Sequence, residues 1–429
     1  MEQLVFPMTA TAASDADRVG PKAANLAALG AAGLPIPDGF CIAAAAYRVQ
    51  LASLGLDLTA RRGTNDAEVM AARRQAIAIR LGLLSQPIVP EILEPLLASR
   101  QALLERTNGA PIVVRSSSLV EDRFGSSFAG QFESYLGLDN EADFLTAVRA
   151  CWAALWSPRI LRHMMNHDAS PADTAMGVLV QPLVAARASG GGLSRTADGE
   201  MMLSATWGLG SAIAQGEVVP DRYALSADGK LLSSEAGRKN HSVGCQHHGG
   251  AGTRVLSGDV VWEMCLNHDQ AVELGGYLGK AEELMGMPVE IEWSKDDTGF
   301  KLLQSRPLHL EPAHVPDEIW LRHPALKGQP AGVGWGAGRA CVVNCECELS
   351  RVGPGDILVT KVAGPALSRI LTRVAGVVAE LGGSTSHLAS LARERGIPMV
   401  LGVLNATQRI PDGKHVAVDG VAGIVRWMP

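Results

Sequence analysis

Residues 381–399 (LGGSTSHLASLARERGIPM) combine a nucleophilic side chain with the start of a helix. Two glycines and three hydroxyl residues precede His387, and the pattern after it predicts a helix with Leu388, Leu391 and Ala392 facing a core. A histidine in a first helical turn lies beside free backbone amides and the positive end of the helix dipole, which stabilise a phosphoryl group. Because neutral imidazole is nucleophilic, we expect His387 to carry a phosphoryl group covalently. A capping histidine without chemistry is the alternative that this segment leaves open.

Residues 288–307 read as a hairpin, PVEIEW–SKDDTG–FKLLQSRP, with paired polar residues on each strand. Side chains alternate along a strand, so Glu290 and Glu292 point to one side, where their carboxylates repel unless cations lie nearby. Gln304 and Arg306 have the same spacing on the returning strand. If the register sets them opposite the glutamates, the face offers oxygen ligands and a guanidinium, as magnesium-nucleotide binding requires. The alternative is a solvent-exposed face balanced by Arg306.

Further groups that suit phosphate occur near the N-terminus of the chain. Lys22 opens a helical pattern within residues 19–40, where it can reach a phosphate near the helix N-terminus. Arg115 ends an apolar strand, and the Ser/Gly loop after it, which includes Gly130 and Gln131, supplies backbone amides that can close over polyphosphate. A solvated ion-pair partner is the alternative role for Arg115.

Composition restricts the class of protein. A chain of 429 residues is long enough for two or three domains. The net charge of −6, without a cluster of Lys and Arg, argues against nucleic acid as a partner. The apolar runs are too short for a membrane span and no secretory signal is evident. Seven mostly isolated cysteines indicate a reducing compartment, so we predict a cytoplasmic protein.

A cysteine cluster raises the question of a structural metal. Cys341, Cys345 and Cys347 form a C-x3-C-x-C pattern, and His247 and His248 lie in a Gly-rich turn. The paired C-x2-C spacing of zinc sites is missing, which disfavours a metal there. We expect Cys341 to be a small hydrophobic residue in a strand.

The pattern of elements predicts a mixed α/β (α+β) chain. Helical and strand patterns alternate through residues 1–310. Residues 311–332 are Pro-rich with little periodicity, as expected of an interdomain linker. Residues 333–429 hold the helix of His387 and short predicted strands (ACVV, DILVT, GVVAE and HVAVD), enough for one small α/β domain.

Four motifs occur together in one order along the chain: VRSSSLVEDRFGSSFAGQFESY, SATWGLGSAIAQGEVVPDRY, IEW…LLQSRP and GGSTSHLASLARERGIP. With them the chain resembles the dikinase family that includes phosphoenolpyruvate synthase, pyruvate phosphate dikinase and rifampin phosphotransferase. The resemblance covers nearly the whole chain. It implies an ATP-grasp nucleotide-binding domain over residues 1–310 and a mobile, swivelling phosphohistidine domain over residues 333–429.

The resemblance also implies roles for single residues. Lys22 and Arg115 would bind ATP phosphates and act in catalysis, and His387 would be the nucleophile. Magnesium or manganese would be bound by Glu290, Glu292 and Gln304. The phosphate-covering loop would include Gly130, Gln131 and Ser134, and the hinge strand that meets adenine would include Gln181, Leu183 and Val184. Glu292 and Gln304 would serve the nucleotide as well as the metal, with Arg306 beside the phosphates and Glu217 near the nucleotide.

In this family the histidine attacks the β-phosphoryl group of ATP, and the products are AMP, phosphate and a phosphohistidine that phosphorylates an acceptor. Each displacement needs only in-line positioning and charge neutralisation. One histidine must then visit two sites, which predicts rigid-body movement of its domain. Two positions depart from the family pattern: Pro21 stands where glycine is usual, and Glu290 where aspartate is usual.

No acceptor-binding domain is recognised in the sequence, which leaves alternatives. The chain is expected to be either a minimal dikinase acting on a small molecule, or a kinase subunit that feeds a partner protein, as in phenylphosphate synthase. A non-catalytic nucleotide-responsive module is disfavoured, because the phosphate-binding residues, the carboxylates and His387 occur together.

Overall fold

The computed structural model describes residues 3–56, 66–120, 132, 134–165, 170–246, 250–310, 320 and 322–428. The chain divides into two compact units. The first unit is Met1–Val184 with Cys245–Ala251, and the second is Ala185–Gly244 with Gly252–Pro429. The domain boundaries at residues 310 and 333 stay predictions, since much of the linker lies outside the described residues.

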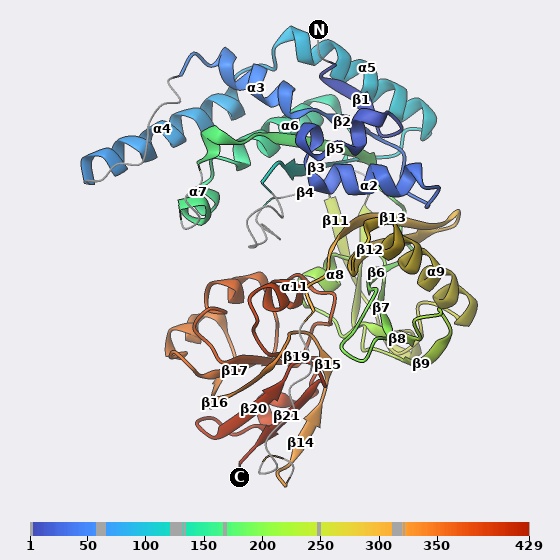
Figure 1. Cartoon of the computed structure of the whole chain (residues 1–429), viewed down its shortest axis with the longest axis vertical. Coiled ribbons are helices and arrows are strands. Elements are labelled where there is room, and N and C mark those ends of the chain that lie inside the picture. The colour runs from blue at the N-terminus through green and yellow to red at the C-terminus, as the bar shows by residue number, and fades with distance from the viewer. Residues whose placement is uncertain are drawn as a thin grey trace. The chain divides into compact units, whose positions relative to one another are not determined.

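The first unit is built on an antiparallel sheet of five strands in the order β1-β2-β5-β3-β4 (Figure 1). Helices α2, α3, α5 and α6 contact its strands, and Phe144 and Trp152 of α6 lie in the apolar core. The strands are Val5–Pro7, Phe40–Ile42, Ile112–Ser118, Ser134–Leu138 and Met176–Pro182. The helices are η1 Thr11–Ser14, α1 Ala16–Val19, α2 Pro21–Ala31, α3 Ala44–Ser53, α4 Asp66–Ser85, α5 Pro90–Arg106, α6 Glu141–Ala154, α7 Pro158–Met165 and η2 Pro171–Asp173.

Within the described residues, no single helix has the length and apolar composition to cross a bilayer. One bent pair, Met70–Ser85 with Pro90–Arg106, meets the criterion by length and composition alone.

The second unit begins with an antiparallel sheet of six strands in the order β13-β12-β6-β7-β8-β9. Gly192, Leu203 and Ile291 form one cross-strand row, and a Cβ at Gly192 would lie 3.2 Å from Leu278 of α9. This row therefore faces α9, which contacts β7, β8, β9 and β12 (Figure 1). The strands are β6 Ala188–Leu193, β7 Met201–Trp207, β8 Asp221–Leu225, β9 Leu231–Glu235, β12 Val289–Asp296 and β13 Gly299–Pro307. Between them lie α8 Ser211–Ala214, the paired strands β10 His241–Gln246 and β11 Gly250–Val255, η3 Gly258–Val261 and α9 His268–Met285.

The C-terminal part of the second unit is a mixed sheet of eight strands in the order β14-β21-β20-β16-β17-β18-β19-β15. Strands β16 to β19 are parallel, and two apolar clusters are built on its strands. The strands predicted from ACVV, DILVT, GVVAE and HVAVD are confirmed as β16, β17, β18 and β20. The strands are Ala325–Lys327, Gln329–Pro330, Trp335–Val343, Ile357–Thr360, Gly376–Ala379, Met399–Leu401, His415–Asp419 and Ile424–Trp427, for β14 to β21 in chain order. The helices are η4 Glu346–Arg351, η5 Pro365–Arg369, α11 His387–Glu394 and α12 Ala406–Arg409.

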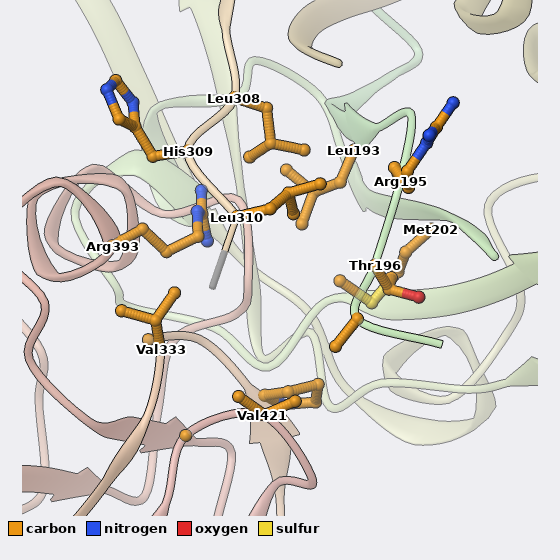
Figure 2. Close-up of a pocket in the computed structure, with 14 residues that line it drawn as sticks. Leu193, Arg195, Thr196, Met202, Leu308, His309, Leu310, Val333, Arg393 and Val421 are labelled. Carbon is orange, nitrogen blue, oxygen red and sulfur yellow. The ribbon is translucent and has the colours of Figure 1, made fainter. Parts of the chain in front are cut away.

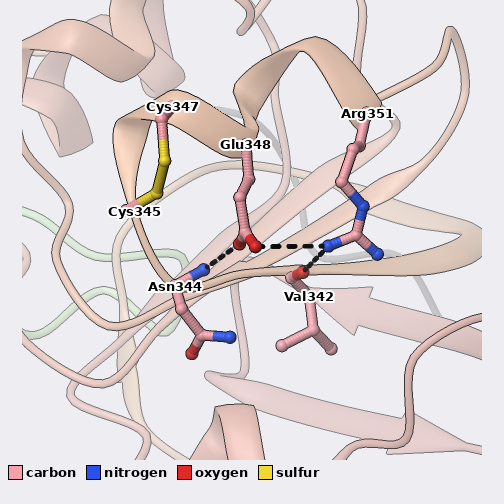
Figure 3. Close-up of a disulfide and its surroundings, with 6 residues drawn as sticks. All are labelled: Val342, Asn344, Cys345, Cys347, Glu348 and Arg351. Carbon is pink, nitrogen blue, oxygen red and sulfur yellow. Dashed lines mark hydrogen bonds and ion pairs between the residues drawn. A yellow bond between two sulfur atoms is a disulfide. The ribbon is translucent and has the colours of Figure 1, made fainter.

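The cysteine cluster differs from the sequence expectation in one respect. Cys345 and Cys347 form a disulfide at the exposed start of η4, which the sequence analysis did not predict (Figure 3). Cys341 is buried in β16, as expected, and burial raises the pKa of its thiol. Among the described residues no group of three or more His, Cys, Asp or Glu could hold a metal ion. His247 and His248 lie outside them.

A buried ion pair links β8 to the segment after β9. Lys239 donates to Asp221, and both side chains are 0% exposed. The carboxylate of Asp221 also accepts the backbone amides of Gly237 and Cys265, each at 2.8 Å. Since a buried charge without its partner is costly, the lysine depends on this carboxylate.

We therefore expect Asp221→Asn to lower the free energy of unfolding by about 3–5 kcal/mol, because it leaves the Lys239 ammonium buried and unpaired. Urea unfolding at pH 7 measures the effect. The matched control is Asp228→Asn, which removes an exposed partner of Lys230 and should leave the unfolding midpoint unchanged. Equal midpoints for the two variants would contradict the dependence of Lys239 on Asp221.

Candidate functional site

The helix of His387 forms as the sequence predicted. The side chain of Ser386 caps the helix by accepting the backbone amide of Ala389, and α11 begins at His387. Leu388, Leu391 and Ala392 lie in the apolar core of the C-terminal part. His387 is half-buried in the first turn of α11. The next residues, Leu388 and Ala389, are buried, and their packing fixes the direction of this end of the helix.

The hairpin of β12 and β13 has the register on which the metal-nucleotide hypothesis depended. Glu290 pairs with Arg306, and Glu292 pairs with Gln304, with a β-bulge after Glu292. Because directly opposed residues share a side of the sheet, the four side chains lie on one face. It is the face opposite to the one that contacts α9. Glu292 is exposed there, whereas Glu290 is buried.

This polar face contacts the segment that carries His387. The hydroxyl of Thr385 is hydrogen-bonded to that of Ser204, and a Cβ at Gly191 would lie 2.6 Å from the Cβ of Thr385. Ser204, Gly191 and Glu292 form one cross-strand row. On the other side of His387, Ser390 lies 2.9 Å from both carboxylate oxygens of Glu290. The histidine segment is therefore seated on the face that carries Glu290, Glu292, Gln304 and Arg306.

Glu290 lies at the centre of a buried charge cluster. Its Oε2 accepts Arg306 Nη2 at 3.1 Å and Arg393 Nη2 at 3.0 Å. The side chains of Glu290, Arg306 and Arg393 are 7%, 15% and 6% exposed. Burial opposes ionisation of Glu290, but the two guanidiniums and the Ser390 hydroxyl outweigh it, so the pKa of Glu290 lies below its ordinary value.

Arg393 connects this cluster to the loop in front of His387. Its Nη1 donates to the backbone carbonyls of Ser384 at 2.6 Å and Ala331 at 3.3 Å. Arg393 and Ser390 were not among the site residues predicted from the sequence. Their spacing of three residues, beside the apolar stripe of α11, is the signal that could have identified a second buried side of the helix.

A second set of contacts involves residues 216–220. The amide of Gly382 donates to the Val218 carbonyl at 3.0 Å, and Gln329 Nε2 donates to the Pro220 carbonyl at 3.0 Å. Glu217 belongs to this segment, and its Oε2 lies 3.1 Å from Nε2 of His241, a partner that sequence reasoning missed. Backbone groups and the Gln329 amide thus form these hydrogen bonds between residues 216–220 and the C-terminal part of the second unit.

In the first unit, Lys22 lies at the start of α2, as predicted. Pro21 occupies the first helical position, where its missing amide costs nothing because that amide has no partner within a helix. The Lys22 ammonium donates to the Ser116 carbonyl of β3 at 3.1 Å. The departure at Pro21 is therefore compatible with the helix that presents Lys22.

Other predicted nucleotide contacts share this sheet. Arg115 pairs with Ser134 across β3 and β4, and Gln181 pairs with Val113, two residues before Arg115. Arg115, Ser134 and Gln181 therefore lie on one face of the sheet. Gln181 is 3% exposed and its Nε2 donates to the Pro37 carbonyl at 3.3 Å. Leu183 and Val184 follow directly after β5, and Gly130 and Gln131 lie outside the described residues.

The sequence comparisons decide the family. Residues 16–320 match the family described as "Pyruvate phosphate dikinase, AMP/ATP-binding domain". The chain belongs to this family. Residues 352–423 match "PEP-utilising enzyme, mobile domain". The helix of His387 lies within this second match.

Relatives of this dikinase-family chain include phosphoenolpyruvate synthases. It is 30% identical to phosphoenolpyruvate synthase of Pyrococcus furiosus, over 96% of this chain and 57% of that protein. It is 32% identical to a probable phosphoenolpyruvate synthase of Archaeoglobus fulgidus (96% and 56%) and 29% identical to the Escherichia coli K12 enzyme (96% and 55%). The chain thus spans little more than half the length of these relatives. An ATP complex of D-alanine–D-alanine ligase from Bacillus anthracis is 6% identical over 67% of this chain and 55% of that chain, with a TM-score of 0.25, too low to carry an argument.

A cavity of about 50 Å³ lies in the second unit of this dikinase-family chain. Figure 2 shows the side chains of Leu193, Leu308 and Leu310 gathered around it, with Arg195 and Arg393 among its lining residues. The volume suits a water molecule or two and is far below that of a nucleotide site. We assign it no part in binding.

Gly191 lets the histidine segment approach the sheet closely. We expect Gly191→Ala to separate Thr385 from the sheet, because the added methyl group would lie 2.6 Å from the Thr385 Cβ. The amide of Gly382, which donates to Val218 within the same contact, should then exchange with deuterium at least about tenfold faster.

The control for this measurement is Gly276→Ala. Gly276 is an exposed residue of α9 with nothing within 4 Å of an added Cβ, so its replacement should leave the exchange rate of Gly382 unchanged. Unchanged protection of Gly382 in Gly191→Ala would show that the histidine segment does not depend on this close approach.

Proposed function

We propose that this chain is a dikinase-type phosphotransferase that takes a phosphoryl group from ATP onto His387 and passes it to an acceptor. The observation that supports the proposal most directly is the seating of residues 385–390 on the face of Glu292, Gln304 and Arg306. Family membership and the AMP/ATP-binding match support ATP as the donor. A nucleophile next to groups that neutralise phosphate charge is what phosphoryl transfer requires.

The chemistry proceeds by displacement at phosphorus. An imidazole nitrogen of His387 forms a bond to the β-phosphorus of ATP, while the bond from that phosphorus to the α,β-bridging oxygen breaks and AMP leaves with the electron pair. Water then cleaves the β,γ-linkage and releases orthophosphate. The remaining phosphohistidine gives its phosphoryl group to the acceptor oxygen and returns the free imidazole.

The residues present fit a divalent cation beside the phosphates. Magnesium prefers hard oxygen ligands and is commonly held by one or two carboxylates together with substrate phosphates. Glu292 and the amide oxygen of Gln304, opposed across β12 and β13, offer such ligands. A bound Mg²⁺ or Mn²⁺ would offset the negative charge of the phosphates. Arg306 would add a guanidinium suited to phosphate oxygens.

The first unit supplies the remaining contacts in this proposal. Lys22 and Arg115 would bind phosphates, and Gln181, Leu183 and Val184 would meet adenine. Glu217 would lie near the nucleotide. The acceptor is a small molecule, bound on this chain or on a partner chain, and the reaction takes place in the cytoplasm.

The proposal predicts that the intact chain with Mg²⁺ and labelled ATP forms AMP and orthophosphate and gains an acid-labile adduct at His387. We expect His387→Ala to abolish AMP formation and the adduct, because the nucleophile is lost, while ATP binding changes less than about twofold. Mass spectrometry of products and intact protein measures both. ADP as the sole product, or AMP released by His387→Ala at the normal rate, would refute the covalent step.

A further inference from the structure

The charge balance around Glu290 separates it from the other predicted metal ligands. One carboxylate faces two guanidiniums, those of Arg306 and Arg393, and both its oxygens also lie 2.9 Å from the Ser390 hydroxyl. Glu394 lies 3.9 Å from Arg306, so the buried cluster holds two guanidiniums and two carboxylates and is neutral without a metal ion. A divalent cation would meet like charge there and would have to displace existing partners. Glu292, by contrast, is exposed on the same face.

We propose that Glu290 and Arg393 form a docking latch that seats the segment of His387 on strands β12 and β13, and that Glu290 is not a cation ligand. Cation binding then falls to Glu292 and Gln304. The latch itself rests on the contacts between Glu290 of β12 and Ser390 and Arg393 of α11, while its consequence for His387 rests on the proposed function.

The contacts of Arg393 make it a positioning residue for His387. One guanidinium nitrogen binds Glu290, and another binds the carbonyls of Ser384 and Ala331. Ser384 lies three residues before His387, so the latch joins the sheet to the loop that leads into the first turn of α11. A planar guanidinium with several donors can make these bonds at once, which a lysine ammonium at the end of a flexible chain cannot reproduce.

A buried ion pair such as Glu290–Arg393 suits a contact between β12 and α11 that forms and separates repeatedly. Desolvation of the two partners offsets much of their attraction, so a buried pair adds little net stability although it strongly restricts geometry. When the two groups separate, water hydrates both charges, and this hydration compensates for the attraction that is lost. The latch therefore aligns the segment when it is seated without holding it there permanently.

A cross-link reports the seated arrangement directly. Ser204→Cys with Thr385→Cys places two thiols where the hydroxyls are hydrogen-bonded, and a disulfide between them closes a loop that changes mobility on a non-reducing gel. We expect Glu290→Gln and Arg393→Gln each to slow cross-linking at least about tenfold in this background. The slowing in the double variant should fall short of the product of the two single effects, because each single variant already loses the Glu290–Arg393 pair.

Two further variants keep this test decisive. Arg339→Gln removes a guanidinium from an ion pair with Asp356 in the same part of the chain and should leave the cross-linking rate unchanged. Arg393→Lys keeps the charge but not the geometry, and it replaces Arg393→Gln if that variant fails to fold. Normal cross-linking in Glu290→Gln, or additive effects in the double variant, would overturn the latch.

The cation assignment is tested by titration of Mn²⁺ in the presence of ATP, followed by electron paramagnetic resonance. Glu292→Gln should weaken Mn²⁺ binding more than about tenfold, and Glu290→Gln less than about twofold. Equal losses in the two variants would make Glu290 a ligand and refute the assignment. Cross-linking needs no ATP, so a wild-type chain that forms no phosphohistidine would refute the proposed function while the latch is still tested.

Discussion

One face of the six-stranded sheet is apolar and the other is polar, and the packing of the second unit depends on this difference. Gly192, Leu203 and Ile291 face α9. Glu290 and Glu292 alternate with Ile291 along β12, so their side chains lie on the other face. A shift of the register by one residue would bury both carboxylates under α9. The buried face therefore fixes which side chains are available to the histidine segment.

The contact of that segment with the sheet is made of hydrogen bonds, one charge cluster and close backbone approaches. Gly191 and Gly383 leave room that a Cβ would fill, since the Cβ position lies 2.6 Å from Thr385 and 2.4 Å from Pro220, respectively. Such a contact fixes geometry through shape and paired polar groups. A broad apolar contact would instead be stabilised in proportion to its buried area, at about 25 cal/mol per Å². The paired polar groups and the close approaches thus define where the histidine segment lies on the sheet.

The features that could be predicted from the sequence are those that depend on local residue patterns. The apolar spacing of Leu388, Leu391 and Ala392 placed α11, and the alternation along β12 placed Glu290 and Glu292 on one face. Contacts over long separations had no such signal. The bond between Arg393 and Glu290 joins residues 103 positions apart, and only the folded chain brings them together.

The roles of the neighbouring carboxylates Glu290 and Glu292 were also ambiguous in the sequence. Two carboxylates spaced by two suggested a shared cation, because like charges on one face need compensation. The compensation for Glu290 comes instead from Arg306 of the adjacent strand and Arg393 of α11, and neither can be assigned before the register and the helix contact are known.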